Sequence, residues 1–250
     1  MATAKKTTEK APVGLGRLET KTMEVYLKGV SPIIMNAMSA KSKQELLMPR
    51  KKTTADKAQK LKHEVLQEYN DSCYRTVGNN NPTRILFPVS GLKTALMTAA
   101  LEVPGAKKTQ IARLIWTEGD YIPIYGTPQI LMSVVRSADI NKTPDIRIRA
   151  ILKEWAVKVK LTYVTPTLTS TDVTRLIEAA GLVVGLGDFR QEKGKGSYGQ
   201  FRIATPDEVA GILKLGLIQQ DKAFANPEYY DLETEKLFEW YRQERKERGR

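Results

Sequence analysis

The spacing of apolar residues predicts a strand at the start of the ordered chain. In residues 22–30 apolar side chains alternate with polar ones, a period of two that is typical of a half-buried strand. The apolar positions of this alternation are Met23, Val25 and Leu27. Ser31-Pro32 either ends the strand or forces it to an edge of the sheet, and residues 33–35 are candidates to continue it beyond the proline.

Helical spacing of apolar residues recurs in four later segments. The first begins near Ser90, whose side chain can cap the first turn, and Pro104-Gly105 ends it. The four expected helices cover about residues 90–102, residues 169–180, a segment after Pro206 and a charged segment from Leu232. Alternating apolar runs between the first two helices predict strands at residues 112–116, 121–125, 130–136 and 146–164.

The order of these elements predicts an α+β fold. The predicted elements follow one another in the order strand, insertion, helix, several strands, helix, glycine-rich loop and strand. This order is a split β-α-β pattern, in which helices back an antiparallel sheet. We therefore expect a ferredoxin-like or RRM-like sheet. Residues 1–21 are expected to be a flexible basic arm, 22–204 a core with a basic helical insertion at about 38–82, and 205–250 a C-terminal helical extension.

Composition removes several kinds of chemistry. The 250 residues include one cysteine, Cys73, and one histidine, His63, so neither an internal disulfide nor a Cys/His metal centre is expected. No apolar run approaches the roughly 18 residues that a membrane span needs, and residues 1–21 lack the apolar stretch of a secretory signal. We expect a cytoplasmic protein without a cofactor and without a membrane partner.

Positive charge is the first feature that indicates a partner. The formal net charge is +12, and residues 41–62 hold eight basic side chains, Arg50 among them, against two acidic ones. Such an excess is typical of a surface that binds a polyanion, although a solvated helix is the plainer interpretation. Residues 228–250 interleave both signs of charge, so we interpret them as a solvated helix face.

A glycine-rich segment between the second helix and the last strand is the most distinctive part of the sequence. Residues 185–199 contain five glycines. Glycine lets backbone N–H groups approach a phosphate, which Arg190, Lys193 and Lys195 would neutralise, and the ring of Tyr198 offers a plane for base stacking. The loop precedes a strand, so it matches neither a nucleotide-hydrolysing phosphate loop nor a dinucleotide fingerprint. A flexible surface loop is the alternative.

Two further features are candidate anion contacts. Free N–H groups at the helix start near Ser90, with Lys93 one turn inside, form an anion site, although ordinary capping explains the same residues. Arg147 and Arg149 share one strand face and are placed to follow a phosphodiester backbone, but exposed strand faces are often basic. We interpret the three tryptophans as core or interface residues; they are Trp116, Trp155 and Trp240.

Three segments in order resemble the RAMP superfamily, which includes the repeating backbone subunits of CRISPR effector complexes. ILFPVSGLKTAL at residues 85–96 resembles the family stretch I-P-G-S-S-L-K-G-A-L, with Gly91 and Thr94 in place of its second serine and its glycine. VYLKGVSP at residues 25–32 is similar to the first-strand motif V-x-I-x-G-x-S-P-L. Residues 185–203 resemble the C-terminal glycine-rich loop and its strand, in a version longer than the shortest of the family.

The resemblance implies a modified RNA-recognition-type fold that holds single-stranded RNA or DNA by its backbone and polymerises along it. It implies that Ser90, Lys93, Lys51 and Lys52 face the strand. It also implies that a thumb-like hairpin, at about residues 134–145, contacts the next subunit. The small size suits a stand-alone, phage-encoded relative.

Two alternatives to a non-catalytic, sequence-independent binder remain. Some RAMP proteins cleave RNA with a histidine or an aspartate, which makes His63, Asp56 and Asp71 candidates for an endoribonuclease site. A solvated helix is the commoner setting for His63, and no second carboxylate accompanies either aspartate at a suitable spacing. The other alternative is a structural assembly protein whose positive charge serves packing between copies.

Overall fold

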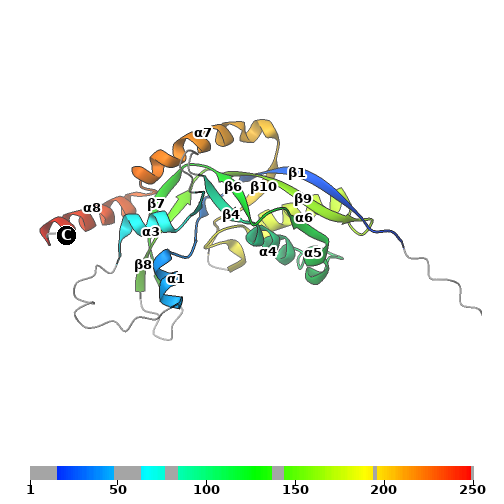
Figure 1. The fold of residues 1–250 in the computed structure, drawn as a ribbon, viewed down its shortest axis with the longest axis horizontal. Helices are drawn as coiled ribbons and strands as arrows, with labels where there is room; N and C mark the ends of the chain where they lie inside the picture. Colours follow the sequence, from blue (N-terminus) through cyan, green and yellow to red (C-terminus); the bar gives the residue numbers. More distant parts are fainter. Residues whose placement is uncertain (1–15, 48–62, 77–83, 137–143, 194–195, 249–250) are drawn as a thin grey trace, which may run out of the picture.

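The protein has a mixed α+β fold with two antiparallel sheets. The computed structural model describes residues 16–47, 63–76, 84–136, 144–193 and 196–248. In this part of the chain, the larger sheet runs across the molecule and the smaller one lies at the end that also carries the C-terminal helix (Figure 1).

The larger sheet is built around its two longest strands, β1 (Glu19–Gly29) and β9 (Ala156–Thr165), which pair from Glu19↔Thr165 to Lys28↔Ala156. β10 (Phe201–Ala204) pairs with β1 and forms one edge of the sheet. On the other side of β9 the order is β6 (Tyr121–Tyr125), β4 (Ile85–Pro88) and β3 (Tyr74–Arg75). β5 (Ile115–Thr117) also pairs with β9. Every pairing is antiparallel. The predicted alternation in the first strand is confirmed, because Val25 and Leu27 are buried.

The smaller sheet consists of β2 (Ile33–Ile34), β8 (Pro144–Leu152) and β7 (Pro128–Arg136). β7 and β8 form one long hairpin ladder. β2 pairs with β8, so the expectation that residues 33–35 continue the first strand is wrong. Pro32 has no N–H for a ladder, and the chain changes sheets at this residue.

Helices cover both faces of the larger sheet. On one side lie α4 (Val89–Ala99), α5 (Lys108–Leu114), α6 (Ser170–Ala179) and the π-helical turn η1 (Ala180–Val184), and on the other lies α7 (Pro206–Ala225) (Figure 1). At the smaller sheet, α3 (Val65–Asp71) packs on β8 and α8 (Leu232–Glu247) packs on β7. Among the described residues, the helices not yet mentioned are α1 (Ala40–Leu47) and the 3-10 turn η2 (Gln191–Lys193).

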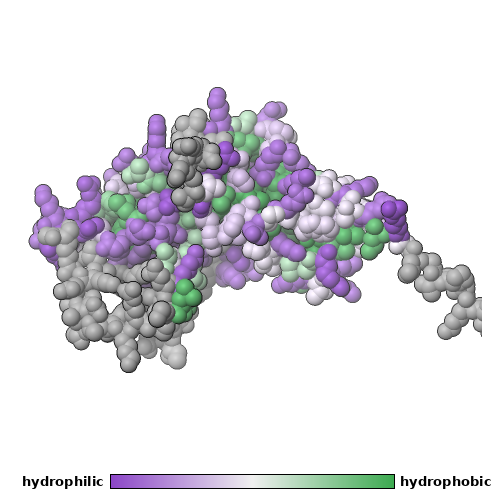
Figure 2. Space-filling view, in the orientation of Figure 1, coloured by the Kyte–Doolittle hydropathy of each residue, from purple (hydrophilic) through white to green (hydrophobic). Residues whose placement is uncertain are grey.

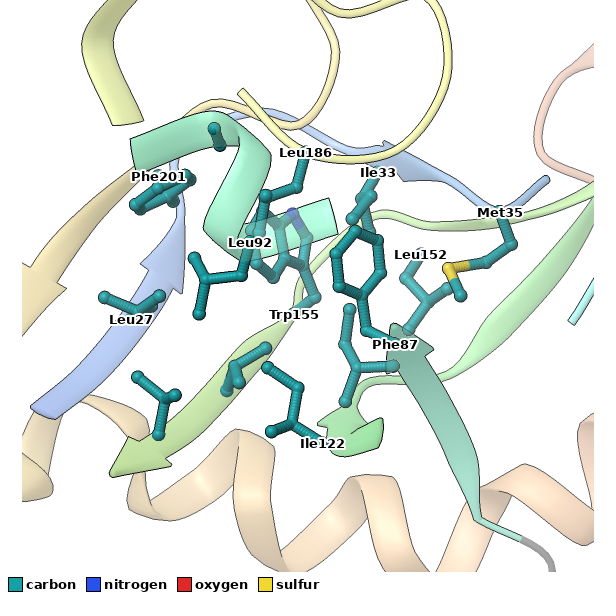
Figure 3. Close-up of a cluster of buried hydrophobic side chains, with 14 of the residues drawn as sticks. Leu27, Ile33, Met35, Phe87, Leu92, Ile122, Leu152, Trp155, Leu186 and Phe201 are labelled. Atoms are coloured by element: carbon teal, nitrogen blue, oxygen red, sulfur yellow. The ribbon is translucent and has the colours of Figure 1, made fainter. Parts of the chain in front are cut away.

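The main core lies between the larger sheet and α4. Figure 3 shows Trp155 among side chains from β1, β10, α4 and the glycine-rich loop, including Leu92 and Leu186. Trp155 is fully buried, and its Nε1 donates a hydrogen bond of 2.8 Å to the Ser31 carbonyl. Gly29 is required beside it, because a Cβ there would overlap the indole ring. The expectation that Trp155 is a core residue is therefore confirmed.

Two sequence-predicted strands differ from the structure. Residues 112–116 contain the end of α5 and the start of β5: Ile111 is buried from the helix, and Ile115, whose backbone is already extended, is buried as the first residue of β5. The alternating stretch 146–164 is divided by a turn at residues 153–154 into β8 and β9, which belong to different sheets. Within β8 and within β9, the side chains that share a face are those that the alternation predicts.

The predicted insertion contributes more to the core than its composition indicates. Val65 and Tyr69 of α3 are buried, and the Tyr69 hydroxyl lies 3.2 Å from the carbonyl oxygens of Pro128 and Ala223. α1 carries exposed leucines at Leu46 and Leu47. The described part of this segment thus contains one exposed helix and one that packs into the fold.

Polar side chains dominate the surface that Figure 2 shows, with smaller groups of hydrophobic residues between them. Within the described ranges, no helix has both the length and the apolar character that crossing a membrane requires.

Candidate nucleic-acid interface

The glycine-rich loop and the start of α4 lie next to each other in space. A pocket of about 200 Å³ lies between them, with Pro88 and Gly91 on the helix side. The loop side and the remaining wall of this pocket are formed by Gly185, Leu186, Gly187, Arg190, Met35, Asn36, Tyr74 and Phe87. Two segments that the sequence separates by more than ninety residues therefore share one concave surface.

Backbone hydrogen bonds hold the described part of the loop against the chain that follows β1. Gly199 donates to the Pro32 carbonyl at 2.7 Å, and Asp188 donates to the Ile34 carbonyl at 3.0 Å. Gly187 has a φ of +80°, and a Cβ there would stand 2.5 Å from the Ile34 oxygen. The side chain of Leu186 points into the core (Figure 3). These described residues of the loop are therefore bonded to, or packed against, the body of the fold.

The start of α4 differs in one respect from the prediction. Pro88 is the N-cap residue, with φ −65° and ψ 129°, and no side chain caps the helix. Ser90 lies inside the first turn with its side chain exposed, so the expectation that it caps the helix is wrong. The Val89 N–H donates to the Asp120 carbonyl at 2.9 Å. The N–H groups that follow have no intrahelical acceptor, as at every helix start.

Arg147 and Arg149 lie on the same face of β8, as predicted, but only one of them is exposed. Arg149 forms an ion pair with Asp188 of the loop, and its side chain is 13% exposed. Burial, and next the positive charge of Arg147, lower the pKa of the Arg149 guanidinium to about 10, so it stays charged at neutral pH. Arg147 is exposed and remains a candidate phosphate contact, whereas Arg149 joins the hairpin to the loop.

The other basic loop residues also differ in their surroundings. Arg190 donates to Glu192 at 2.8 Å and to the Gly187 carbonyl at 3.1 Å, so part of its charge is balanced within the loop. Lys193 is exposed at the end of η2, and Lys93 is half-buried on α4. The candidates Arg50, Lys51, Lys52 and Lys195 lie outside the described residues.

Tyr198 is more enclosed than a free stacking platform. Its half-buried ring packs against a small cluster of Ile34, Leu131 and Ile151, beside Tyr230. The Nζ of Lys153 lies 5.4 Å from the centre of the Tyr230 ring. Sequence reasoning missed the roles of Tyr230, Lys153 and Asp188. The contacts of Tyr230 with Tyr198 and Lys153, and of Asp188 with Arg149, depend on how the smaller sheet packs against the loop.

The candidate catalytic residues are engaged in local contacts. The ring of His63 has Glu68 within 3.1 Å of Nδ1 and Asp145 at 3.3 Å from Nε2. Asp71 accepts a hydrogen bond of 2.8 Å from Gln67, and Asp56 lies outside the described residues. In the part of the chain that the structure describes, no three His, Cys, Asp or Glu side chains are grouped to hold a metal ion.

Neither a protein-family model nor a curated protein matches the sequence.

Proposed function

We propose that the protein binds single-stranded RNA or DNA without reading its sequence and polymerises along it as a RAMP-like filament backbone. One observation carries this proposal: the pocket that the α4 start shares with the glycine-rich loop. Its lining includes Pro88 and Gly91 from the start of α4, together with Arg190 and Tyr74. A helix start and a guanidinium suit a phosphate, and an aromatic residue suits a neighbouring base. The proposal places the protein in a bacterial cytoplasm, or in a host cytoplasm if a phage encodes it.

The order of strands supports the ferredoxin-like part of the proposal. Apart from the elements between β1 and α4, which include β3 and β4 of the same sheet, and the β7–β8 hairpin, the chain runs β1, α4, α5, β5, β6, β9, α6 and β10. The strand order β10-β1-β9-β6, antiparallel throughout, is what a split β-α-β arrangement with two helices on one face produces. The β7–β8 hairpin would be the thumb, although its predicted tip, residues 137–143, lies outside the described residues.

Charge sets how strongly such a surface would bind. Asp188 and Glu192 balance Arg149 and Arg190, so the contacts to phosphate would come chiefly from Arg147, Lys93 and Lys193. A small number of cations without a described acidic partner predicts modest affinity per subunit, and polymerisation along the strand would raise the affinity of the whole assembly.

Titration with labelled oligothymidylate and oligouridylate, between about 50 and 200 mM salt, tests the proposal. The logarithm of the affinity should fall with the logarithm of salt by about 0.7 for each phosphate contacted. Sedimentation of the same mixtures should show assemblies that grow with strand length. A flat salt dependence, or a preference for duplex, would reject the proposal.

Charge-reversal variants connect this binding to the candidate interface. Arg147→Glu and Lys93→Glu should each weaken binding and reduce the salt dependence. Lys236→Glu, which makes the same charge change at an exposed position of α8, is the control and should bind as the wild type does. Equal losses in all three variants would show a general effect of net charge and would count against a local interface.

Absence of catalysis is part of the proposal. Labelled RNA incubated with and without Mg²⁺ should remain intact. Cleavage that is lost in Asp56→Ala, His63→Ala or Asp71→Ala would instead identify a ribonuclease. Assembly that is unchanged by nucleic acid, together with no binding, would identify a structural assembly protein.

A further inference from the structure

Part of one face of the larger sheet is not covered by any described helix. α7 covers the end of this face near Tyr26, Ala156 and Ala204, which pack against Val209. β1 and β9 continue beyond the end of α7 (Figure 1). Cross-strand register places six residues on the uncovered part of the same face, and we call them the open strip: Thr22, Glu24, Trp116, Lys158, Lys160 and Thr162.

Trp116 stands out among the residues of the open strip. It is the middle residue of β5, and its neighbour Ile115 is buried on the opposite face. Trp116 lies across from Thr162, is half-buried and belongs to none of the hydrophobic clusters of the described chain. Beside it the hydroxyl oxygens of Thr22 and Thr162 lie 3.1 Å apart. Thr22 is exposed, whereas Thr162, which lies across from Trp116, is buried. A half-buried aromatic ring thus adjoins one exposed hydroxyl group at the uncovered part of the sheet.

The lysines of the open strip leave a positive charge next to this ring. Lys158 forms an ion pair of 3.0 Å with Glu24 and so balances the one carboxylate of the strip. Lys160 is exposed, and no described residue forms an ion pair with it. The two lysines are two residues apart on one strand, so their Cα atoms are about 7 Å apart. Unbalanced charge therefore lies beside Trp116, the aromatic ring of the strip.

We infer that the open strip is a second contact surface for single-stranded nucleic acid, on the opposite side of the sheet from α4. A base stacks on Trp116, and Lys160 pairs with a phosphate beside it. The inference rests on the proposed function, because it extends the path of the same strand beyond the pocket. Charge complementarity favours this partner, because Lys160, which has no ion-pair partner among the described residues, suits a phosphate. A protein partner for a flat sheet face would require a broader apolar surface than one tryptophan supplies.

Binding measurements on Trp116→Ala and Lys160→Glu test this inference. Trp116→Ala should weaken binding to oligouridylate by about tenfold, since one stacked base contributes about 1 to 3 kcal/mol. Lys160→Glu should reduce the salt slope by about 0.7. Lys236→Glu on α8 is the matched control, and thermal unfolding of each variant checks that the fold is retained.

Fluorescence gives a direct readout of Trp116. In a Trp240→Phe background only Trp116 and the buried Trp155 remain. A base stacked on Trp116 should quench the tryptophan fluorescence when oligouridylate is added. This quenching should be lost when Trp116 is also replaced by phenylalanine, because Trp155 is buried. Phenylalanine keeps the apolar contact, which makes this the variant of choice if Trp116→Ala does not fold.

The outcomes separate the inference from the proposed function. The inference is wrong and the proposed function stands if three results occur together. The wild type binds nucleic acid, Arg147→Glu weakens this binding, and the Trp116 and Lys160 variants bind as the wild type does. In that case the strip is a solvated sheet face. If the wild type shows no binding at any salt concentration, the proposed function and the inference fail together.

Discussion

Arg149 of β8 and Asp188 of the glycine-rich loop form an ion pair that joins the smaller sheet to the candidate interface. Their side chains are 13% and 30% exposed, so water screens the pair less than it screens a surface contact. The Asp188 N–H is also bonded to the Ile34 carbonyl. One residue of the loop is therefore held at both its backbone and its carboxylate, which fixes the wall of the pocket.

Removal of this carboxylate should destabilise the protein. Asp188→Ala leaves the largely buried Arg149 guanidinium without its counter-charge, and we expect a loss of about 1 to 3 kcal/mol in the free energy of unfolding. Urea unfolding followed by circular dichroism measures it. Glu24→Ala is the control, since its pair with Lys158 is about half exposed and should change stability by less than about 0.5 kcal/mol. Equal stability of the two variants would contradict this account.

Two glycine substitutions should act in opposite directions. Gly187→Ala places a Cβ 2.5 Å from the Ile34 carbonyl oxygen at a positive φ, and should destabilise the protein by about 1 to 3 kcal/mol. Gly211→Ala lies in α7 with open space around its Cβ, and should stabilise it by about 0.5 to 1 kcal/mol. Melting temperatures compare the two. A Gly187→Ala protein that melts with the wild type would show that the loop tolerates another path.

The start of α7 should make stability depend on acid. The Arg202 guanidinium, and then the backbone N–H of Thr205, lower the pKa of the Glu208 carboxyl from 4.5 to about 2. The folded value lies below the unfolded one, so Glu208 stabilises the fold above about pH 4.5, and this contribution is lost as the pH falls toward 2. Unfolding free energies across this window should fall less steeply in Glu208→Gln than in the wild type.

A control separates this effect from general acid unfolding. Glu239→Gln removes a carboxyl at an exposed position of α8 and should keep the wild-type slope. If Glu208→Gln and the wild type lose stability at the same rate, Glu208 is not coupled to folding.

Cys73 should react only when the protein unfolds. The thiol is buried, and burial is the main cause that raises its pKa to about 12, so the reactive thiolate is scarce near neutral pH. A chromogenic disulfide reagent at about pH 8 should label the folded protein very slowly and the urea-unfolded protein within minutes. Fast labelling of the folded protein would show that the segment around α3 opens locally.

Local sequence determined much of the secondary structure. Alternation predicted β1, and the helix expected at residues 169–180 begins with a capping box in which Thr169 and Asp172 bond each other's backbone. These predictions hold because a strand face or a helix cap depends on residues within a few positions of each other. The prediction that Arg147 and Arg149 lie on the same face of a strand is confirmed for the same reason.

Contacts between distant segments could not be predicted in this way. Asp188 neutralises Arg149, and Tyr198 packs on Ile34, only because the smaller sheet folds against the loop. The pattern of residue types along the chain indicates which side chains share a face of a strand or helix. The net charge of a surface depends in addition on which acidic side chains the folded chain brings close to the basic ones. The sequence by itself therefore determined the elements and the basic character of the protein, and the tertiary structure decided which of the basic side chains remain exposed.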